Sequence, residues 1–193
     1  MLSMSIRQQF LVGLVLTLLM LLTRGHHFTS LEFLPSASWA VFFLAGVYFR
    51  SGWLFALLFL FAWIVDFAVY LSSSVGSFCI TPAYAFLLPA YGSLWLAGRW
   101  YKHYYRFNFR TLVPLTIAVV FGGFICEVIS SGSFYFFSGY FSQTSLVEFS
   151  ERLWLYFPLS LQSLSFYVCL AVLVHACFML NDKKSRISSL ESK

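Results

Sequence analysis

The thiol of Cys79 lies in a polar stretch, residues 72–82 (SSSVGSFCITP), between two apolar ones. The serines and Gly76 there favour a folded, non-helical loop packed over the mouth of a cavity. A thiolate in such a loop is a soft ligand for a transition metal and a nucleophile toward an electrophile. A buried cysteine also serves as a small apolar side chain. Cys79 is therefore a candidate metal ligand, with packing as the alternative role.

Two carboxylates interrupt otherwise apolar stretches. Asp66 lies about four residues before the end of 53–70, and Glu127 has a similar place in a later stretch. An ionisable group inside a membrane segment is costly and faces the interior of the bundle or a cavity. Each carboxylate therefore either contacts a ligand or forms a structural ion pair. For Asp66 the candidate partners are Arg24 and Arg152.

Histidines and aromatic residues add two weaker signals. His26 and His27 follow the first apolar stretch, and imidazole is both a metal ligand and a general acid or base. Adjacent histidines have no metal-site spacing, so a hydrogen-bonding role is the alternative. Residues 133–141 (SFYFFSGYF) are unusually aromatic for a connection. We expect either an interfacial aromatic belt or a lid over a large, partly apolar ligand.

The composition indicates which elements position these residues. The 193 residues are 60% hydrophobic, 21% aromatic and 10% charged, whereas soluble domains are about 25% charged. The sequence therefore predicts an all-α integral membrane protein, a compact bundle of six transmembrane helices in a single domain. The predicted spans are 10–23, 36–49, 53–70, 83–98, 111–130 and 153–180, followed by a cytoplasmic tail at 181–193.

Basic residues predict the orientation of the bundle. Of the 12 lysines and arginines, all but Arg24 and Arg152 fall on one side of the predicted spans. Such asymmetry is typical of the cytoplasmic side. We expect both termini in the cytoplasm, and the loops with His27 and Cys79 on the outer face.

Several classes of protein are disfavoured. The basic residues form no continuous face for nucleic acid. The chain has no P-loop motif and therefore no ATP site of that kind. It has no GxSxG motif and no paired catalytic carboxylates. Its four cysteines include no CxxC pair, so they indicate neither a zinc site nor a disulfide framework.

Taken together, the residues resemble a known family: the solitary cobalamin-specific S-components of energy-coupling factor (ECF) transporters, of the BtuM type. The likeness covers nearly the whole chain. It rests on six spans in a chain of this size, the stretch 24–28 (RGHHF), Asp66 late in the third span, the stretch 77–84 (SFCITPAY) and Arg152 at the start of the sixth span.

The resemblance implies a function and a site. It implies capture of cobalamin from the periplasm, then toppling of the bundle in the bacterial inner membrane to release cobalamin inside. The family's loop cysteine, here Cys79, would donate its sulfur to the corrin cobalt, for which a thiolate is a suitable ligand. The resemblance also implies that His27, Asp66, Tyr84 and Arg152 surround the corrinoid.

Some alternatives stay open at this point. Cys79 coordination could also remove the upper axial ligand of cobalamin, which would make the chain an accessory enzyme. Without the resemblance, Cys79 and His27 could be nucleophile and base of a membrane-embedded enzyme. An ECF coupling protein with its ATPase pair is a possible partner. However, the first span offers only Gly13 and Thr17 where such proteins typically have an AxxxA pair.

Overall fold

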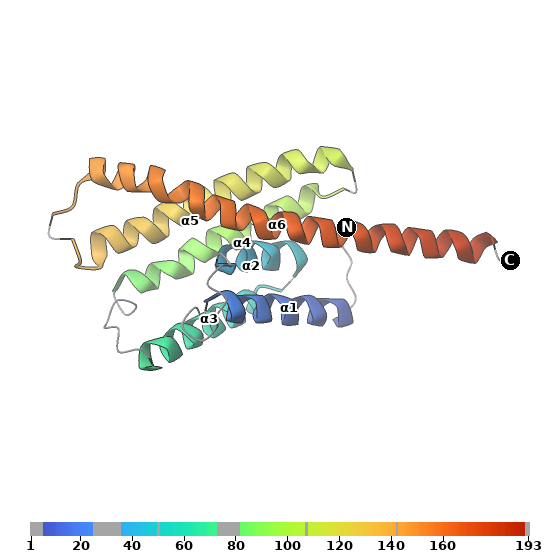
Figure 1. The fold of residues 1–193 in the computed structure, drawn as a ribbon, viewed down its shortest axis with the longest axis horizontal. Helices are drawn as coiled ribbons and strands as arrows, with labels where there is room; N and C mark the ends of the chain where they lie inside the picture. Colours follow the sequence, from blue (N-terminus) through green and yellow to red (C-terminus); the bar gives the residue numbers. More distant parts are fainter. Residues whose placement is uncertain are drawn as a thin grey trace.

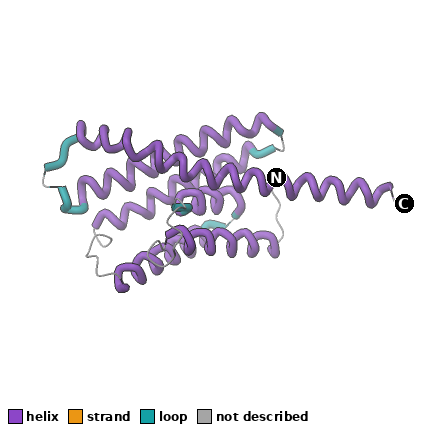
Figure 2. Tube along the Cα trace, viewed as in Figure 1, coloured by secondary structure: helices purple, strands orange, loops and turns teal. Residues whose placement is uncertain are grey.

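The structure is a computed structural model that describes residues 6–24, 36–49, 51–72, 82–106, 108–141 and 143–191. This part of the chain is helical and contains no strand (Figure 2). The elements, in chain order, are α1 (Ile6–Arg24), α2 (Ser38–Tyr48), α3 (Trp53–Ser72), the short 3₁₀ helix η1 (Pro82–Phe86), α4 (Leu87–Tyr104), the short 3₁₀ helix η2 (Phe109–Thr111), α5 (Leu112–Phe137) and α6 (Leu146–Glu191).

Within the described residues, three helical segments are long and apolar enough to cross a membrane: Arg7–Arg24, Phe109–Phe137 and Leu146–Met179. Only 17%, 33% and 17% of their most apolar windows are buried inside the protein, so their outward faces suit contact with lipid chains rather than water. Shorter apolar helices cover Ser38–Tyr48 and Trp53–Ala68. The all-helical, membrane-protein character predicted from the sequence is therefore confirmed, and length and composition support three spans.

The predicted loop at 133–141 is wrong in its first half. Residues 133–137 are the last residues of α5, and α6 begins at Leu146, so the connection is much shorter than expected. The helix accommodates the serines there, since their hydroxyls donate to backbone carbonyls of the preceding turn, as Ser130 does to Cys126 (2.8 Å) and Ser133 to Ser130 (2.9 Å). The chain leaves the helix near Gly139, whose φ is 76°.

The end of the chain also differs from the expectation. Residues 181–191, predicted as a tail after the last span, continue α6, which passes without interruption through Pro158. The C-terminal part of α6 extends beyond the other helices (Figure 1). No glycine or proline follows Pro158 in the sequence, so nothing there ends the helix.

The core of the bundle is α2, of which nine of the eleven residues are buried. It packs against α4 (Figure 1). A Cβ placed on Gly46 would lie 2.1 Å from the carbonyl oxygen of Trp95, and one on Gly98 would lie 2.1 Å from that of Phe43. The two helix backbones therefore touch, and only glycine fits at either crossing position.

Side-chain contacts show that successive helices run in alternating directions. The end of α1 meets the start of α2 where Arg24 contacts Ser38 (2.9 Å). Near η1, the end of α5 lies beside the start of α4, since the rings of Phe86 and Phe137 stack at 5.3 Å. We call the end of the bundle where these contacts lie the site end. The opposite end is marked by Tyr105, after α4, whose hydroxyl lies 2.8 Å from Nε2 of His175 on α6.

Candidate functional site

Arg24, the last residue of α1, forms a two-pronged ion pair with Asp66 of α3. Its Nε lies 2.6 Å from Oδ1 of Asp66 and its Nη2 lies 2.6 Å from Oδ2. The two side chains are only 12% and 20% exposed. Paired, hydrogen-bonded geometry of this kind is what makes buried charges tolerable inside a bundle.

Three further side chains complete the cluster. Nη1 of Arg24 donates to the hydroxyls of Ser38 (2.9 Å) and Tyr91 (3.1 Å). The hydroxyl of Tyr84 donates to Oδ2 of Asp66 (2.6 Å). We call Arg24, Ser38, Asp66, Tyr84 and Tyr91 the Arg24 clamp. Its members come from α1, α2, α3, η1 and α4, so the clamp ties together every described element at the site end except α5 and α6.

Aromatic packing supports the Arg24 clamp. The ring of Tyr91 stacks on that of Phe42 at 4.5 Å between centroids, and Phe42 is fully buried in α2. The guanidinium carbon of Arg24 lies 5.7 Å from the centre of the same Tyr91 ring. Rigid neighbours of this kind fix the direction of the Arg24 side chain, which would otherwise have several rotamers.

The geometry decides part of the ambiguity about Asp66. Of its two candidate partners, Arg24 is the one that pairs with it. An ionised carboxylate accepts about four hydrogen bonds, and Asp66 already accepts three, two from Arg24 and one from Tyr84. Tyr84 has used its one donor but keeps lone pairs that can accept. A ligand at this place would therefore find acceptors on Tyr84 and one remaining position on Asp66.

Cys79 and His27, two of the predicted site residues, lie outside the described residues. Their positions in the chain are nevertheless informative. Residues 25–35 join Arg24 to α2, and residues 73–81 join α3 to η1. Both stretches thus begin and end on elements that the Arg24 clamp holds together. His27 follows Arg24 by three residues, and Cys79 precedes Pro82 by three.

Arg152, the remaining predicted site residue, lies in a second cluster between α5 and α6. Its Nε and Nη2 lie 3.1 and 2.9 Å from Oε1 of Glu148. Its guanidinium carbon lies 4.7 Å from the ring centre of Phe141 and 5.6 Å from that of Tyr135. The Tyr135 hydroxyl donates to Oε2 of Glu148 (2.9 Å) and accepts from the amide of Ser145 (3.0 Å). Tyr135 and Phe141, from the aromatic residues 133–141, thus hold the Arg152 side chain in place.

The two clusters lie at the same end but are separate. Among the described residues, no hydrogen bond or ion pair joins Arg152 to Asp66 or Tyr84. The link between them is indirect, because Ser133 of α5 reaches the carbonyl oxygen of Ala83 in η1 at 3.5 Å. The structure therefore brings Asp66 and Tyr84 together, and Arg152 stands apart from them.

A Tyr135→Phe variant is expected to lower the free energy of unfolding by about 1 kcal/mol, because the buried Tyr135 side chain loses the hydroxyl that bonds the Glu148 carboxylate and the Ser145 amide. Tyr156→Phe is a suitable control, since Tyr156 is 48% exposed on α6. Chemical unfolding in detergent micelles would measure both. Equal midpoints for the two variants would contradict a structural role for the Tyr135 hydroxyl.

Glu127, the other carboxylate singled out in the sequence, is buried in α5 at 4% exposure. The hydroxyl of Ser131, one turn later in the same helix, donates to its Oε1. Within the described part of the chain this is the one side-chain hydrogen bond to the Glu127 carboxylate. Glu127 is therefore a local partner of its own helix, and the structure does not bring it into contact with the Arg24 clamp.

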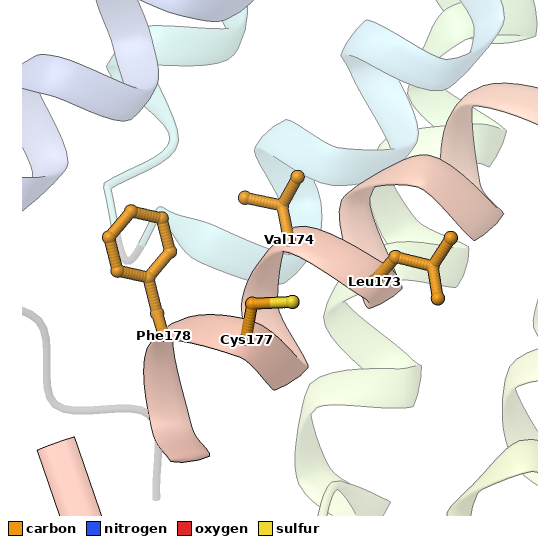
Figure 3. Close-up of a pocket in the computed structure, with 4 residues that line it drawn as sticks. All are labelled: Leu173, Val174, Cys177 and Phe178. Atoms are coloured by element: carbon orange, nitrogen blue, oxygen red, sulfur yellow. The ribbon is translucent and has the colours of Figure 1, made fainter. Parts of the chain in front are cut away.

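Other possible ligand sites are poor. The described residues contain no group of three His, Cys, Asp or Glu side chains that could hold a metal ion. A shallow hollow on α6 is lined by Leu173, Val174, Cys177 and Phe178 (Figure 3). Its walls are apolar, so it has nothing with which to orient a polar ligand. The Arg24 clamp is thus the most polar buried cluster that the structure describes.

Sequence reasoning missed two members of the clamp and named a third only as a partner. Ser38 and Tyr91 gave no signal, because a serine and a tyrosine in apolar stretches are common. Arg24 was recognisable as one of two arginines on the side where basic residues are rare. An arginine that breaks the charge asymmetry is a sign of a specific partner, and here that partner is Asp66.

The fold and the site define an α-helical membrane protein with a buried, charged clamp at one end of its bundle. No protein-family model matches the chain, and no curated protein matches it either. Any more specific function therefore has to be argued from the residues themselves.

Proposed function

We propose that this chain is a substrate-binding membrane protein for cobalamin uptake, of the solitary S-component type. In this proposal six helices cross the bacterial inner membrane, both termini are cytoplasmic, and the site end faces the periplasm. The cobalt of the bound cobalamin is ligated by the Cys79 thiolate. The observation that carries the proposal is the Arg24 clamp, which brings Asp66 and Tyr84 together on the elements that the stretches with His27 and Cys79 join in the sequence.

Covalent reach supports this arrangement. Three residues span at most about 10 Å of extended chain, so the Cα of Cys79 is tethered within about that distance of Pro82, the first residue of η1. The same limit ties His27 to Arg24. Since Arg24 and η1 meet at Asp66, the proposal has Cys79 and His27 share one ligand beside the Arg24 clamp. A ligand of corrinoid size would contact residues from both stretches.

The hydrogen-bonding state of the clamp also suits a corrinoid. The many amide side chains of a corrinoid need acceptors for their N–H groups. The Tyr84 hydroxyl donates a hydrogen bond to Asp66, so its oxygen keeps lone pairs that can accept from a ligand. At the edge of the same end, the Arg152 side chain is 39% exposed and keeps donors beyond its bonds to Glu148. Donors and acceptors are therefore both available.

The ECF coupling protein and its ATPases are a separate question. Toppling of a small bundle needs few protein contacts on its lipid-facing sides, and α1 has an exposed apolar face that includes Phe10 and Val15. That face suits lipid as well as a coupling protein. Growth of a cobalamin auxotroph that expresses this chain without any ATPase module would show whether the chain transports alone.

The proposal is tested by the absorbance of the purified protein with and without added cobalamin. We expect bound corrinoid in the wild type with a shifted cobalt spectrum, and loss of the shift in Cys79→Ala, because the sulfur ligand is removed. Cys177→Ala is the matched control, since Cys177 is an exposed cysteine on α6. Absence of corrinoid from the wild type, or an unchanged spectrum in Cys79→Ala, would sink the proposed ligation.

A further inference from the structure

The opposite end of the bundle carries a concentrated positive charge. From the last turns of α4 to the start of α5 the sequence of residues 99–110 reads RWYKHYYRFNFR, with four arginines or lysines and no carboxylate. Indeed no acidic residue occurs between Asp66 and Glu127. We call Arg99, Lys102, Arg106 and Arg110 the basic collar. Nothing acidic nearby in the sequence offsets its charge.

Two members of the basic collar, Arg106 and Arg110, are exposed, and we call them the outer cations. Neither side chain has an ion pair with a described carboxylate. Large aromatic side chains lie between the cations: Trp100 is 41% exposed, Tyr104 54% and Phe109 88%. Alternation of cations with exposed aromatic rings is typical of residues at the boundary between lipid chains and headgroups.

The other two members of the basic collar, Arg99 and Lys102, contact the protein itself. The guanidinium carbon of Arg99 lies 4.7 Å from the ring centre of Trp95. The Lys102 ammonium approaches the carbonyl oxygen of Phe49, the residue that follows α2, at 3.5 Å. These contacts complement the partial negative charge at the C-terminal ends of helices. A dipole of about half a charge cannot neutralise the whole collar, so the outer cations remain for another partner.

The position of the outer cations indicates where that partner lies. Arg110 is the second residue of the apolar segment Phe109–Phe137, which is long enough to cross a membrane. Arg106 precedes that segment by only three residues. Both arginines are therefore at the edge of the bilayer, at the depth of lipid phosphates. A planar guanidinium binds phosphate with two parallel hydrogen bonds, which suits arginine to this role.

We propose that the basic collar is a binding site for anionic phospholipid headgroups, with Arg106 and Arg110 as its phosphate ligands. The exposed rings of Trp100, Tyr104 and Phe109 lie among the acyl chains and glycerol groups of the same lipids. The charge of the collar and its place at the membrane edge favour a lipid over an acidic protein segment, which would need no exposed apolar rings. The site does not depend on the identity of the transported substrate.

The test uses the full chain in nanodiscs made from phosphatidylcholine and phosphatidylglycerol in equal amounts, followed by native mass spectrometry of the lipids that stay bound. We expect the wild type to retain phosphatidylglycerol preferentially. An Arg106→Gln/Arg110→Gln variant is expected to reduce this preference by about thirtyfold, since each arginine contributes separately to phosphate binding. Added salt should weaken the preference of the wild type.

The control removes the same number of charges elsewhere. Arg186→Gln/Lys193→Gln changes two basic residues that follow Met179, the end of the apolar segment of α6, by seven and fourteen residues, farther along the chain from an apolar segment than Arg106 and Arg110 are. This variant is expected to keep the wild-type preference. An equal loss in both double variants would mean that the total charge matters and the collar does not. No preference in the wild type, or co-purification of an acidic protein that the arginine variant loses, would also overturn the proposal.

Discussion

Replacement of Arg24 by glutamine is expected to lower the free energy of unfolding by about 3–5 kcal/mol. The variant leaves the Asp66 carboxylate, only 20% exposed, with Tyr84 as its remaining partner. A buried charge without its counter-ion is costly, and inside a membrane bundle water cannot replace the lost donors. The midpoint of chemical unfolding in detergent micelles is the measurement.

A second substitution separates charge from packing. In Arg24→Gln/Asp66→Asn both charges are gone, so the double variant should be more stable than the single one, even though it has lost one more native side chain. Arg152→Gln is the matched control on the other ion pair. There both side chains are more than a third exposed, at 39% and 44%, so water replaces the lost partner and little stability should be lost. If Arg24→Gln and Arg152→Gln lowered the midpoint of unfolding by the same amount, the Arg24–Asp66 pair would not behave as a buried ion pair.

The Arg24 clamp also shows how far the sequence could lead toward the site. Charge asymmetry placed Asp66 and two arginines on one side of the bundle, and hydropathy placed Asp66 inside a helix. The choice between the arginines needed the relative position of α1 and α3, which neither pattern reports. For Arg152 the spacing held more information, because Glu148 lies four residues earlier, and on one helix such residues are neighbours.

Helix ends were harder to predict than helices. Serine and tyrosine lower the hydropathy of residues 130–137, so that segment resembled a connection. In the structure, serine hydroxyls there donate to carbonyls of their own helix, and the Tyr135 hydroxyl finds Glu148. Polar atoms that are satisfied locally do not require water. Average hydropathy cannot distinguish such residues from a true loop.

No pattern in the sequence predicted the contact between α2 and α4, yet a substitution there is expected to cause a large loss of stability. We had singled out Gly13 and Thr17 of α1 as small residues that allow close approach of helices. The closest approach instead involves Gly46 and Gly98, which lie in different helices and therefore share no spacing along the chain. Small residues that meet across two helices are visible only once the helices are placed.

Gly98→Ala is expected to destabilise the protein by about 3 kcal/mol, near the upper end for overpacked cores. The added Cβ would lie 2.1 Å from the carbonyl oxygen of Phe43 and 3.1 Å from the amide nitrogen of Val47. Both are backbone atoms, so no side chain can rotate away and α2 must move as a whole. Because Ser38 at the start of α2 holds Arg24, such a movement also disturbs the Arg24 clamp.

Gly92→Ala provides the control in the same helix. There the added Cβ would meet only the ring of Phe55 at 4.0 Å, an ordinary contact. Alanine is the better helix former by about 1 kcal/mol, so this variant should be as stable as the wild type or more so. Thermal unfolding in detergent would compare the two. If Gly98→Ala and Gly92→Ala shifted the unfolding temperature in the same direction, the helix propensity of alanine would dominate both results. The close crossing of α2 and α4 would then be refuted.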